Sequence, residues 1–330
     1  MTATLEKIDW ALLDGWQRNF PLVPDPFAEI GNETGIPESE VIARLNRLSR
    51  AGIVSRIGAT CRPNTIGAST LAAIAAPDWR IDEVAGIIGA ETGVNHSYLR
   101  EDAWNIWFVA TGPDREYVDG MLGRIRTATG LEVLDLPLVR PFNIDLGFSL
   151  EGMASSTGTQ RRTDVAALKA GDRQIIQGLC SGLAFVPRPF AGLGDALGIT
   201  EGALLERIRV LLAAGILSRF GVIVRHRALG WRANAMVVWQ VPETEVESAG
   251  LRLIKVPGVT LCYQRRSIAG TWPYNLYCMI HARSRTDAMS VLDRACDVVG
   301  LCDIPHRVLF SVRCFKQTGA MVAVQEGAAA

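Results

Sequence analysis

The spacing of apolar residues changes from a helical to a strand-like period early in the chain. Residues 37 to 52, PESEVIARLNRLSRAG, have an apolar residue at every third or fourth position, which places these residues on one face of a helix. The helical pattern ends at Gly52. Shorter helical stretches precede them at 8 to 19 and 28 to 35, and a strand-like ribbon follows. Three short helices followed by a β-ribbon are typical of a winged helix-turn-helix domain.

The next stretch of the chain alternates between strand and helix patterns. Its apolar residues follow a period of 2 where strands are expected and of 3.6 where helices are expected. The expected elements are a strand at 68–78, a helix at 80–93, strands at 94–102 and 104–112, a helix at 114–130 and a strand at 131–140. The order β-α-β-β-α-β predicts a ferredoxin-like domain, in which two helices cover one antiparallel sheet.

The chain contains this whole arrangement twice. Residues 8 to 67 align with residues 171 to 230 without a gap, and roughly a third of the aligned positions are identical. After a short shift, GVNHSYLRED aligns with GVTLCYQRRS and NIWFVAT with NLYCMIH. The sequence therefore predicts an α+β protein made of two tandem copies of a winged helix-turn-helix followed by a ferredoxin-like domain.

The duplication sets the expected domain boundaries. A stretch rich in Gly, Ser and Thr separates the halves and is expected to be a flexible linker. The expected parts are winged helix-turn-helix 1 at 1–66, ferredoxin-like domain 1 at 67–150, the linker at 151–167, winged helix-turn-helix 2 at 168–229, ferredoxin-like domain 2 at 230–318 and a disordered tail at 319–330.

Charge and cysteine content exclude several classes of function. Lys plus Arg and Asp plus Glu each number 34, so no net positive field attracts nucleic acid or an anionic membrane. The seven cysteines form no C-x-x-C pair and no zinc-finger spacing. No apolar run is long enough to span a membrane, and the N-terminus is too rich in charge for a signal peptide. We therefore expect a cytoplasmic protein with reduced thiols and no metal site.

Motifs in both halves resemble one enzyme family. Pro-Phe precedes the second helix of each half, SRFGVIVRHR is followed by RANAMVVW, and VNHSYLRE is followed by NIWF. This combination is similar to the sirohaem decarboxylases, which share the fold of the Lrp/AsnC regulators. The resemblance implies a carbon-carbon lyase that removes carbon dioxide from acetate side chains of sirohaem. Its product would be (di)decarboxysirohaem, in d1-type haem or alternative haem biosynthesis.

The resemblance also sets the expected cofactor and partners. Loss of carbon dioxide followed by proton uptake needs no redox reagent, so no cofactor is expected beyond the iron tetrapyrrole substrate. The expected partners are sirohaem and downstream enzymes of d1-type haem biosynthesis, with no membrane and no DNA. The family pairs two homologous subunits, which here would form a pseudo-dimer within one chain, and a further homodimer stays open.

Comparison of the two halves singles out two histidines. His226, which is expected on the β-ribbon of the second half, aligns with Pro63, and His96 aligns with Leu261, so each half has a histidine that the other lacks. We predict that both are catalytic and enter one composite pocket. There, a histidine that titrates near neutrality would deliver the proton that completes the new methyl group, or would position the reacting acetate or approach the substrate iron.

Arginine and aromatic residues near these histidines fit a flat polyanionic ligand. Arginine binds carboxylates through a planar fork and stays charged, and aromatic rings offer a macrocycle a stacking surface. The candidate substrate-binding residues are Arg225, Arg219, Arg227, Arg100, Arg265, Tyr98, Tyr263 and Trp231. The remaining histidines, His281 and His306, are expected to be structural.

A ligand-sensing regulator of the Lrp/AsnC type is the main alternative. Its recognition helices would be basic, but the second one here opens with ITEGALLERI, whose small apolar side chains cannot make bidentate contacts with bases. In the first, Arg44, Arg47 and Arg50 are expected to form a solvated face or a remnant of DNA contact. A carrier that binds sirohaem unchanged is a third possibility. The sequence leaves open whether one or two acetates are removed.

Overall fold

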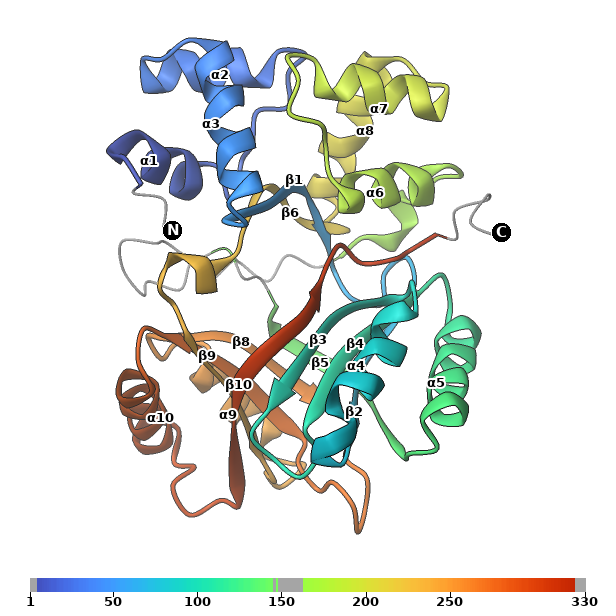
Figure 1. The fold of residues 1–330 in the computed structure, drawn as a ribbon, viewed down its shortest axis with the longest axis vertical. Coiled ribbons are helices and arrows are strands. Elements are labelled where there is room, and N and C mark those ends of the chain that lie inside the picture. Colours follow the sequence, from blue (N-terminus) through green and yellow to red (C-terminus); the bar gives the residue numbers. More distant parts are fainter. Residues whose placement is uncertain (1–4, 145–146, 148–162, 324–330) are drawn as a thin grey trace. The chain divides into compact units, whose positions relative to one another are not determined.

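The computed structural model describes residues 5–144, 147 and 163–323. Most of the expected linker and the end of the expected tail lie outside these residues. Among the described residues, contacts divide the chain into two units, Met1–Ile66 with Arg161–Leu229 and Gly67–Gln160 with Gly230–Ala330 (Figure 1). Each unit therefore combines segments from both halves of the sequence.

Six helices of the first unit form two copies of a three-helix arrangement. Pro26 and Pro189 open the second helix of each copy, and Gly35 and Gly198 end it with positive φ angles of 73° and 67°. The helices are α1 (Lys7–Gly15), α2 (Pro26–Thr34), α3 (Glu38–Arg50), α6 (Asp172–Ser181), α7 (Pro189–Leu197) and α8 (Glu201–Ala213), with a 3-10 turn η2 (Val165–Ala167) before α6. The predicted helix-turn-helix pattern is confirmed in both halves.

The strands of this unit pair between the halves. β1 (Val54–Cys61) comes from the first half and β6 (Leu217–Val224) from the second, and they pair antiparallel with Gly58 opposite Gly221. The prediction of a separate ribbon within each half is therefore wrong. A duplicated sequence has the same apolar pattern whether its copies pair within or between themselves, so the pattern could not distinguish the two.

Glycine at the centre of each ribbon strand lets the first helix of the opposite half approach closely. A Cβ added to Gly58 would lie 2.3 Å from the carbonyl oxygen of Leu179 in α6. A Cβ added to Gly221 would lie 2.4 Å from the carbonyl oxygen of Trp16, just after α1. The same Trp16 carbonyl accepts a 2.7 Å hydrogen bond from the amide of Val222. Only glycine permits this backbone contact.

We expect Gly221→Ala to lower the free energy of unfolding by about 1–3 kcal/mol, the usual cost of an extra methyl group in a packed site. The new methyl group would press on backbone carbonyl oxygens, which cannot rotate away. Gly202→Ala in α8 is the matched control, because nothing lies within 4 Å of its added Cβ. Urea denaturation compares the two variants, and equal midpoints would contradict the close contact.

A buried aspartate in the first helix of each half binds an arginine of the third helix. Asp9 accepts hydrogen bonds from Arg44 (3.1 Å) and Arg47 (2.7 Å), and Asp172 accepts one from Arg207 (2.6 Å). Burial raises the pKa of both carboxyl groups, but hydrogen bonds from arginine and backbone amides outweigh it, and the net pKa is lowered. Arg44 and Arg47 therefore anchor α1 to α3, while Arg47 and Arg50 are exposed, as expected for a solvated face.

We expect Asp9→Asn to lower the free energy of unfolding at neutral pH by about 3 kcal/mol, because it leaves a buried ion pair without its anion. Folding lowers the pKa of Asp9, so its contribution is present above the unfolded value of 3.8 and is lost as pH falls through the folded value. Below about pH 4, the wild-type chain should therefore lose stability more steeply than the variant. Denaturation as a function of pH measures this difference.

Asp195→Asn, on the exposed surface of α7, is the control for this experiment. It should follow the wild-type pH dependence. If Asp9→Asn follows it as well, Asp9 is not the titrating group.

Eight strands of the second unit form a closed barrel. The order around the barrel is β10-β3-β4-β2-β5-β8-β9-β7, so four neighbouring strands from the first half close against four from the second. The strands are β2 (Ala68–Ile74), β3 (Val94–Arg100), β4 (Ile106–Gly112), β5 (Val133–Asn143), β7 (Ala233–Trp239), β8 (Val259–Arg265), β9 (Leu276–Ala282) and β10 (His306–Gln317). Each half follows the order β-α-β-β-α-β, so the ferredoxin-like prediction is confirmed.

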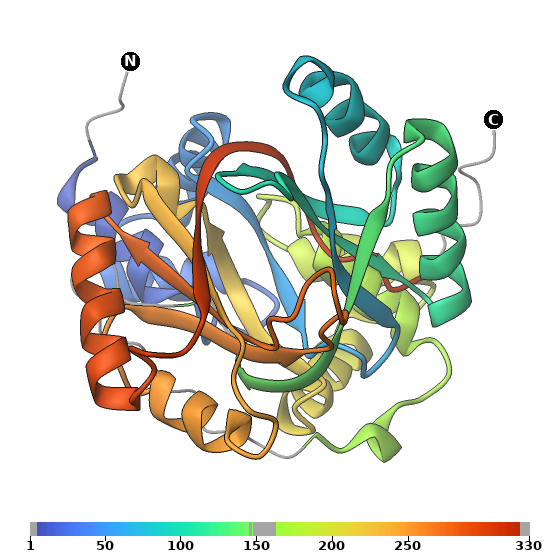
Figure 2. The same cartoon turned by 90° about the horizontal axis from the view of Figure 1, so that it is seen from below.

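Two helices from each half cover the outside of this barrel (Figure 2). They are α4 (Ile81–Ala90), which follows a 3-10 turn η1 (Asp78–Arg80), α5 (Arg115–Thr129), α9 (Val246–Leu253) and α10 (Arg285–Val299). One apolar cluster per half lies between helices and strands, and a third, with Trp107, Trp272 and Tyr277, joins strands of both halves inside the barrel. No helix in the described ranges is long and apolar enough to cross a membrane.

Candidate active site

β3 and β8 carry matching residues on the inner face of the barrel. Alternate residues of a strand lie on one face. On this face lie His96, Tyr98 and Arg100 of β3 and Leu261, Tyr263 and Arg265 of β8. Leu261 and Tyr263 belong to the apolar cluster inside the barrel, which identifies the face. The rings of His96 and Tyr98 stack with centroids 6.4 Å apart, so the structure brings together the three residues predicted on β3.

The two arginines of these strands lie against tyrosine rings. The Arg100 guanidinium lies 5.5 Å from the Tyr98 ring centroid, and that of Arg265 lies 4.7 Å from the Tyr263 centroid. Arg100 donates a 3.0 Å hydrogen bond to the Leu309 carbonyl oxygen, and Arg265 donates a 2.8 Å bond to that of Leu136. Backbone and ring contacts thus fix both guanidinium groups.

Neither guanidinium group has an acidic partner within ion-pair distance in the described part of the chain. Arg100 is only 6% exposed, and the Nε atoms of Arg100 and Arg265 have no hydrogen-bond acceptor there. Burial is the main cause that lowers the pKa of both groups. A buried cation without an anion is costly. An incoming carboxylate would supply the missing charge at both positions.

Asn234 and His281 form a polar pair beside Arg100 that is not among the residues predicted for the site. Asn234 of β7 lies opposite His281 of β9, and its side-chain nitrogen is 2.7 Å from His281 Nε2. Its oxygen lies 3.5 Å from Arg100 Nη1. His281 aligns with Thr111 of the first half, so the comparison that singled out His96 and His226 would also have found it.

His226 and its neighbouring arginines lie in the first unit, and their local structure differs from the predicted one. β6 ends at Val224, and residues His226–Leu229 form a 3-10 turn, η3, so the expectation that His226 lies on a strand is wrong. The amide of Arg225 donates a 2.8 Å hydrogen bond to the Ile53 carbonyl oxygen, which fixes the start of this turn. Arg219 is buried within β6, and Arg227 is exposed.

The surroundings of His226 disfavour its protonated form. Burial lowers the pKa of His226 to about 4, and the positive charge of Arg219 adds to this effect. The expectation that His226 titrates near neutrality is therefore not met in the chain without a ligand. A carboxylate bound to Arg219 would remove part of the positive charge and raise the pKa of His226 again.

Trp231 and His306 contact residues outside the predicted site set. Trp231 begins the second-half part of the barrel unit and is 6% exposed, with the Arg283 guanidinium 5.5 Å from its ring centroid. His306 is exposed at the start of β10, where its Nδ1 lies 3.0 Å from the Ile304 carbonyl oxygen. Within the described ranges, no group of three or more His, Cys, Asp or Glu side chains could hold a metal ion.

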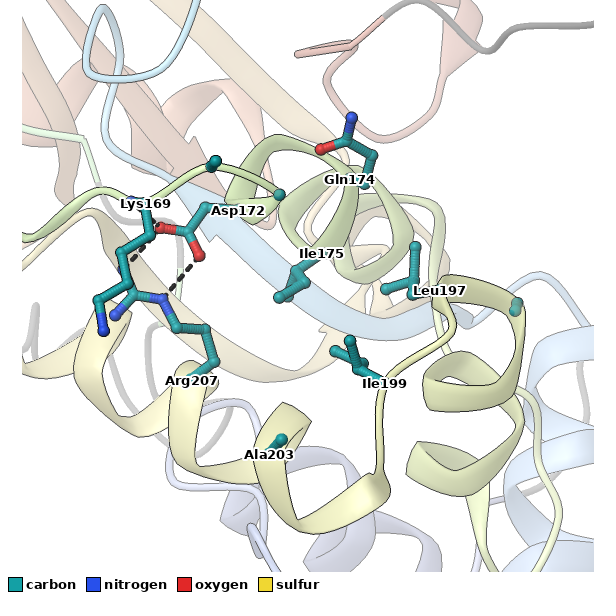
Figure 3. Close-up of a pocket in the computed structure, with 11 residues that line it drawn as sticks. Lys169, Asp172, Gln174, Ile175, Leu197, Ile199, Ala203 and Arg207 are labelled. Carbon is teal, nitrogen blue, oxygen red and sulfur yellow. Dashed lines mark hydrogen bonds and ion pairs between the residues drawn. The ribbon is translucent and has the colours of Figure 1, made fainter.

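A pocket of about 520 Å³ lies in the second helix-turn-helix (Figure 3). Figure 3 shows Arg207 and Asp172 bonded to each other at its rim, with Ile175, Leu197 and Ile199 forming its apolar wall. Asp172 thus already neutralises Arg207. Because none of the candidate residues lines this pocket, we do not place the substrate there.

Comparison with protein families first defines the class of protein. Residues 66–143 and 228–316 match the family described as AsnC-like ligand binding domain. Residues 9–54 and 172–217 match the siroheme decarboxylase NirDL-like HTH domain. The chain is thus a tandem protein of the Lrp/AsnC-like class.

Comparison with individual proteins narrows this class. The chain is 59% identical to the siroheme decarboxylase NirDL subunit of Paracoccus pantotrophus, over 97% of this chain and 98% of that one. The siroheme decarboxylase NirD subunit of Stutzerimonas stutzeri is 44% identical over 44% of this chain and 96% of its own length. The crystal structure of a siroheme decarboxylase NirDL in complex with an iron-uroporphyrin III analogue superposes with a TM-score of 0.66, at 25% identity over 95% of this chain and 93% of that one. The chain belongs to the siroheme decarboxylase NirDL family.

Proposed function

We propose that this chain is a sirohaem decarboxylase, a carbon-carbon lyase that removes carbon dioxide from acetate side chains of sirohaem. The observation that carries the proposal is the pair of arginines, Arg100 and Arg265, held on the inner face of the barrel without an acidic partner in the described residues. Sirohaem has a rim of acetates and propionates around a flat apolar ring. The two arginines suit that rim, and Tyr98 and Tyr263 suit the ring.

The reaction that such a site would perform is balanced without an oxidant or reductant. The bond between the acetate methylene and its carboxylate breaks, and carbon dioxide leaves while the electron pair enters the conjugated macrocycle. A proton then bonds to the methylene carbon and completes a methyl group. We therefore propose no cofactor beyond the iron tetrapyrrole substrate. His226 and His96 remain the predicted proton donors, and the arginines would hold the carboxylates during the reaction.

We also propose the cellular setting of this reaction. Its product would be a mono- or didecarboxylated sirohaem that downstream enzymes of d1-type haem or alternative haem biosynthesis consume. The seven cysteines are all free thiols, which supports a reducing compartment such as the cytoplasm. Separate NirD subunits among the relatives support a pseudo-dimer of fused halves.

Anaerobic incubation of the purified chain with sirohaem, followed by mass spectrometry of the extracted tetrapyrrole, tests the function. We expect a loss of one or two carbon dioxide units that depends on the protein. Binding with unchanged mass would instead indicate a carrier. A lack of binding together with a salt-dependent shift of a specific DNA would indicate a regulator.

A further inference from the structure

A directional chain of hydrogen bonds leads from Arg100 across the second-half strands of the barrel. Arg100 Nη1 lies 3.5 Å from Asn234 Oδ1, and Asn234 Nδ2 lies 2.7 Å from His281 Nε2. His281 Nδ1 lies 2.7 Å from Thr260 Oγ1, which in turn donates a 3.0 Å bond to the Met279 carbonyl oxygen. His281 and Thr260 are 8% and 7% exposed, so water competes little with this chain of bonds.

The donors and acceptors of this chain allow one arrangement of protons. Because the Thr260 hydroxyl donates to the Met279 carbonyl, its oxygen accepts from the Nδ1–H of His281. His281 Nε2 is then an acceptor, and the Asn234 amide group donates to it. This orients the Asn234 oxygen toward Arg100, as a positive donor requires. Each group fixes the orientation of the next one, and the result is a defined position for the guanidinium.

Within the described residues of the first half, no such chain leads to Arg265. Asn234, His281 and Thr260 align with Ser69, Thr111 and Asn95. Thr111 donates instead to the Gly93 carbonyl oxygen at 3.0 Å, and Asn95 Oδ1 has no hydrogen-bond partner in the described residues. Arg265 instead donates a 2.8 Å hydrogen bond to the Leu136 backbone carbonyl oxygen.

The two arginine positions also differ in the residue that shares their strand face. His96 lies on the face of Arg100 and stacks on Tyr98, whereas the aligned residue beside Arg265 is Leu261. A group that can carry a proton is therefore present on the Arg100 strand and is replaced by an apolar one on the Arg265 strand. Decarboxylation needs both a held carboxylate and a proton source.

We propose that Asn234, His281 and Thr260 are positioning residues that hold Arg100 for the reacting acetate, while Arg265 only binds a carboxylate that does not react. The proposal rests on the proposed function, since it assigns roles within the same site. It distinguishes two pseudo-equivalent arginines of one barrel. It also gives a function to His281, for which a structural role was expected from the sequence.

Thr260 allows a test that separates positioning from folding. Thr260→Val keeps the side-chain shape and removes the hydroxyl group, and Thr260→Ser keeps the hydroxyl group. With the full chain and sirohaem, we expect Thr260→Val to lower kcat roughly ten- to a hundredfold, as expected for a displaced binding group, with KM changed less than about twofold. Thr260→Ser should recover most of this loss. If Thr260 had a merely structural role, Thr260→Val would lower the thermal midpoint of unfolding but would not lower kcat selectively while KM stays nearly unchanged.

Asn234→Ala and Ser69→Ala form a matched pair at aligned positions of the two halves. We expect the first to reduce kcat as Thr260→Val does and the second to leave it at the wild-type value. Equal kcat values for both variants, or an unchanged kcat in Thr260→Val, would overturn the proposal while leaving the decarboxylase function intact. A wild-type chain that does not decarboxylate sirohaem would instead overturn the proposed function.

Discussion

Arg100→Met should lower kcat/KM for sirohaem by about a thousandfold, the upper range for the loss of one preorganised charged donor. The substitution keeps the length of the buried stem but removes the positive charge of Arg100. Steady-state turnover with mass-spectrometric detection of the product measures the loss. Arg100→Lys should recover only part of the activity, because an ammonium group cannot bind a carboxylate through two parallel bonds.

The stability of the same variant should change in the opposite direction. Arg100 is 6% exposed and has no carboxylate partner in the described ranges, so its removal relieves a desolvation cost. We therefore expect Arg100→Met to unfold at the same or a higher temperature than the wild-type chain. Arg313→Met is the control for removal of an arginine that is neither buried nor unpaired, because Arg313 is exposed and its guanidinium group pairs with Asp82 at 2.6 Å. Full turnover in Arg100→Met would exclude Arg100 from the site.

His226→Gln should lower sirohaem turnover by about a hundredfold, a typical contribution of general acid–base catalysis, and should also change how stability depends on pH. Folding lowers the pKa of His226 from 6.5 to about 4, so between these values the unfolded chain binds more protons than the folded one. Stability therefore rises with pH across this window and falls as the pH drops toward 4, by at most about 3 kcal/mol for this one group. His226→Gln should flatten the curve there.

Proton uptake gives a second measurement for His226. If a substrate carboxylate neutralises Arg219, the pKa of His226 rises on binding, and the complex takes up a proton at mildly acid pH. Calorimetry in buffers of different ionisation enthalpy would detect this proton in the wild-type chain. His306→Gln, at an exposed position, serves as the control and should take up the same number of protons on binding as the wild-type chain. Equal uptake in His226→Gln would mean that another group titrates.

The sequence predicted the elements of the fold but not how they pair. The helices and strands follow from local apolar periods, capping glycines and prolines, which act within a few residues. The pairing of β1 with β6, and of β5 with β8, depends on contacts between copies that share one pattern. That information does not lie in the periodicity of either copy.

The candidate site shows the same division. Arg100 and Arg265 could be found because each follows a tyrosine at the same place in both halves. That no acidic side chain in the described residues pairs with these arginines could not be predicted, because the residues that surround them come from distant strands. His226 was found by comparison with Pro63, but its lowered pKa depends on burial and on Arg219.

Because strands of one half pair with strands of the other, the barrel requires the two halves in equal amounts. The barrel closes through β3 against β10 and β5 against β8, so it needs one copy of each half. Two separate polypeptides would have to be made in equal amounts, and their complex would dissociate on dilution. In a single chain the ratio is fixed at translation and the halves meet at a constant effective concentration. Assembly of this protein should therefore be independent of its expression level.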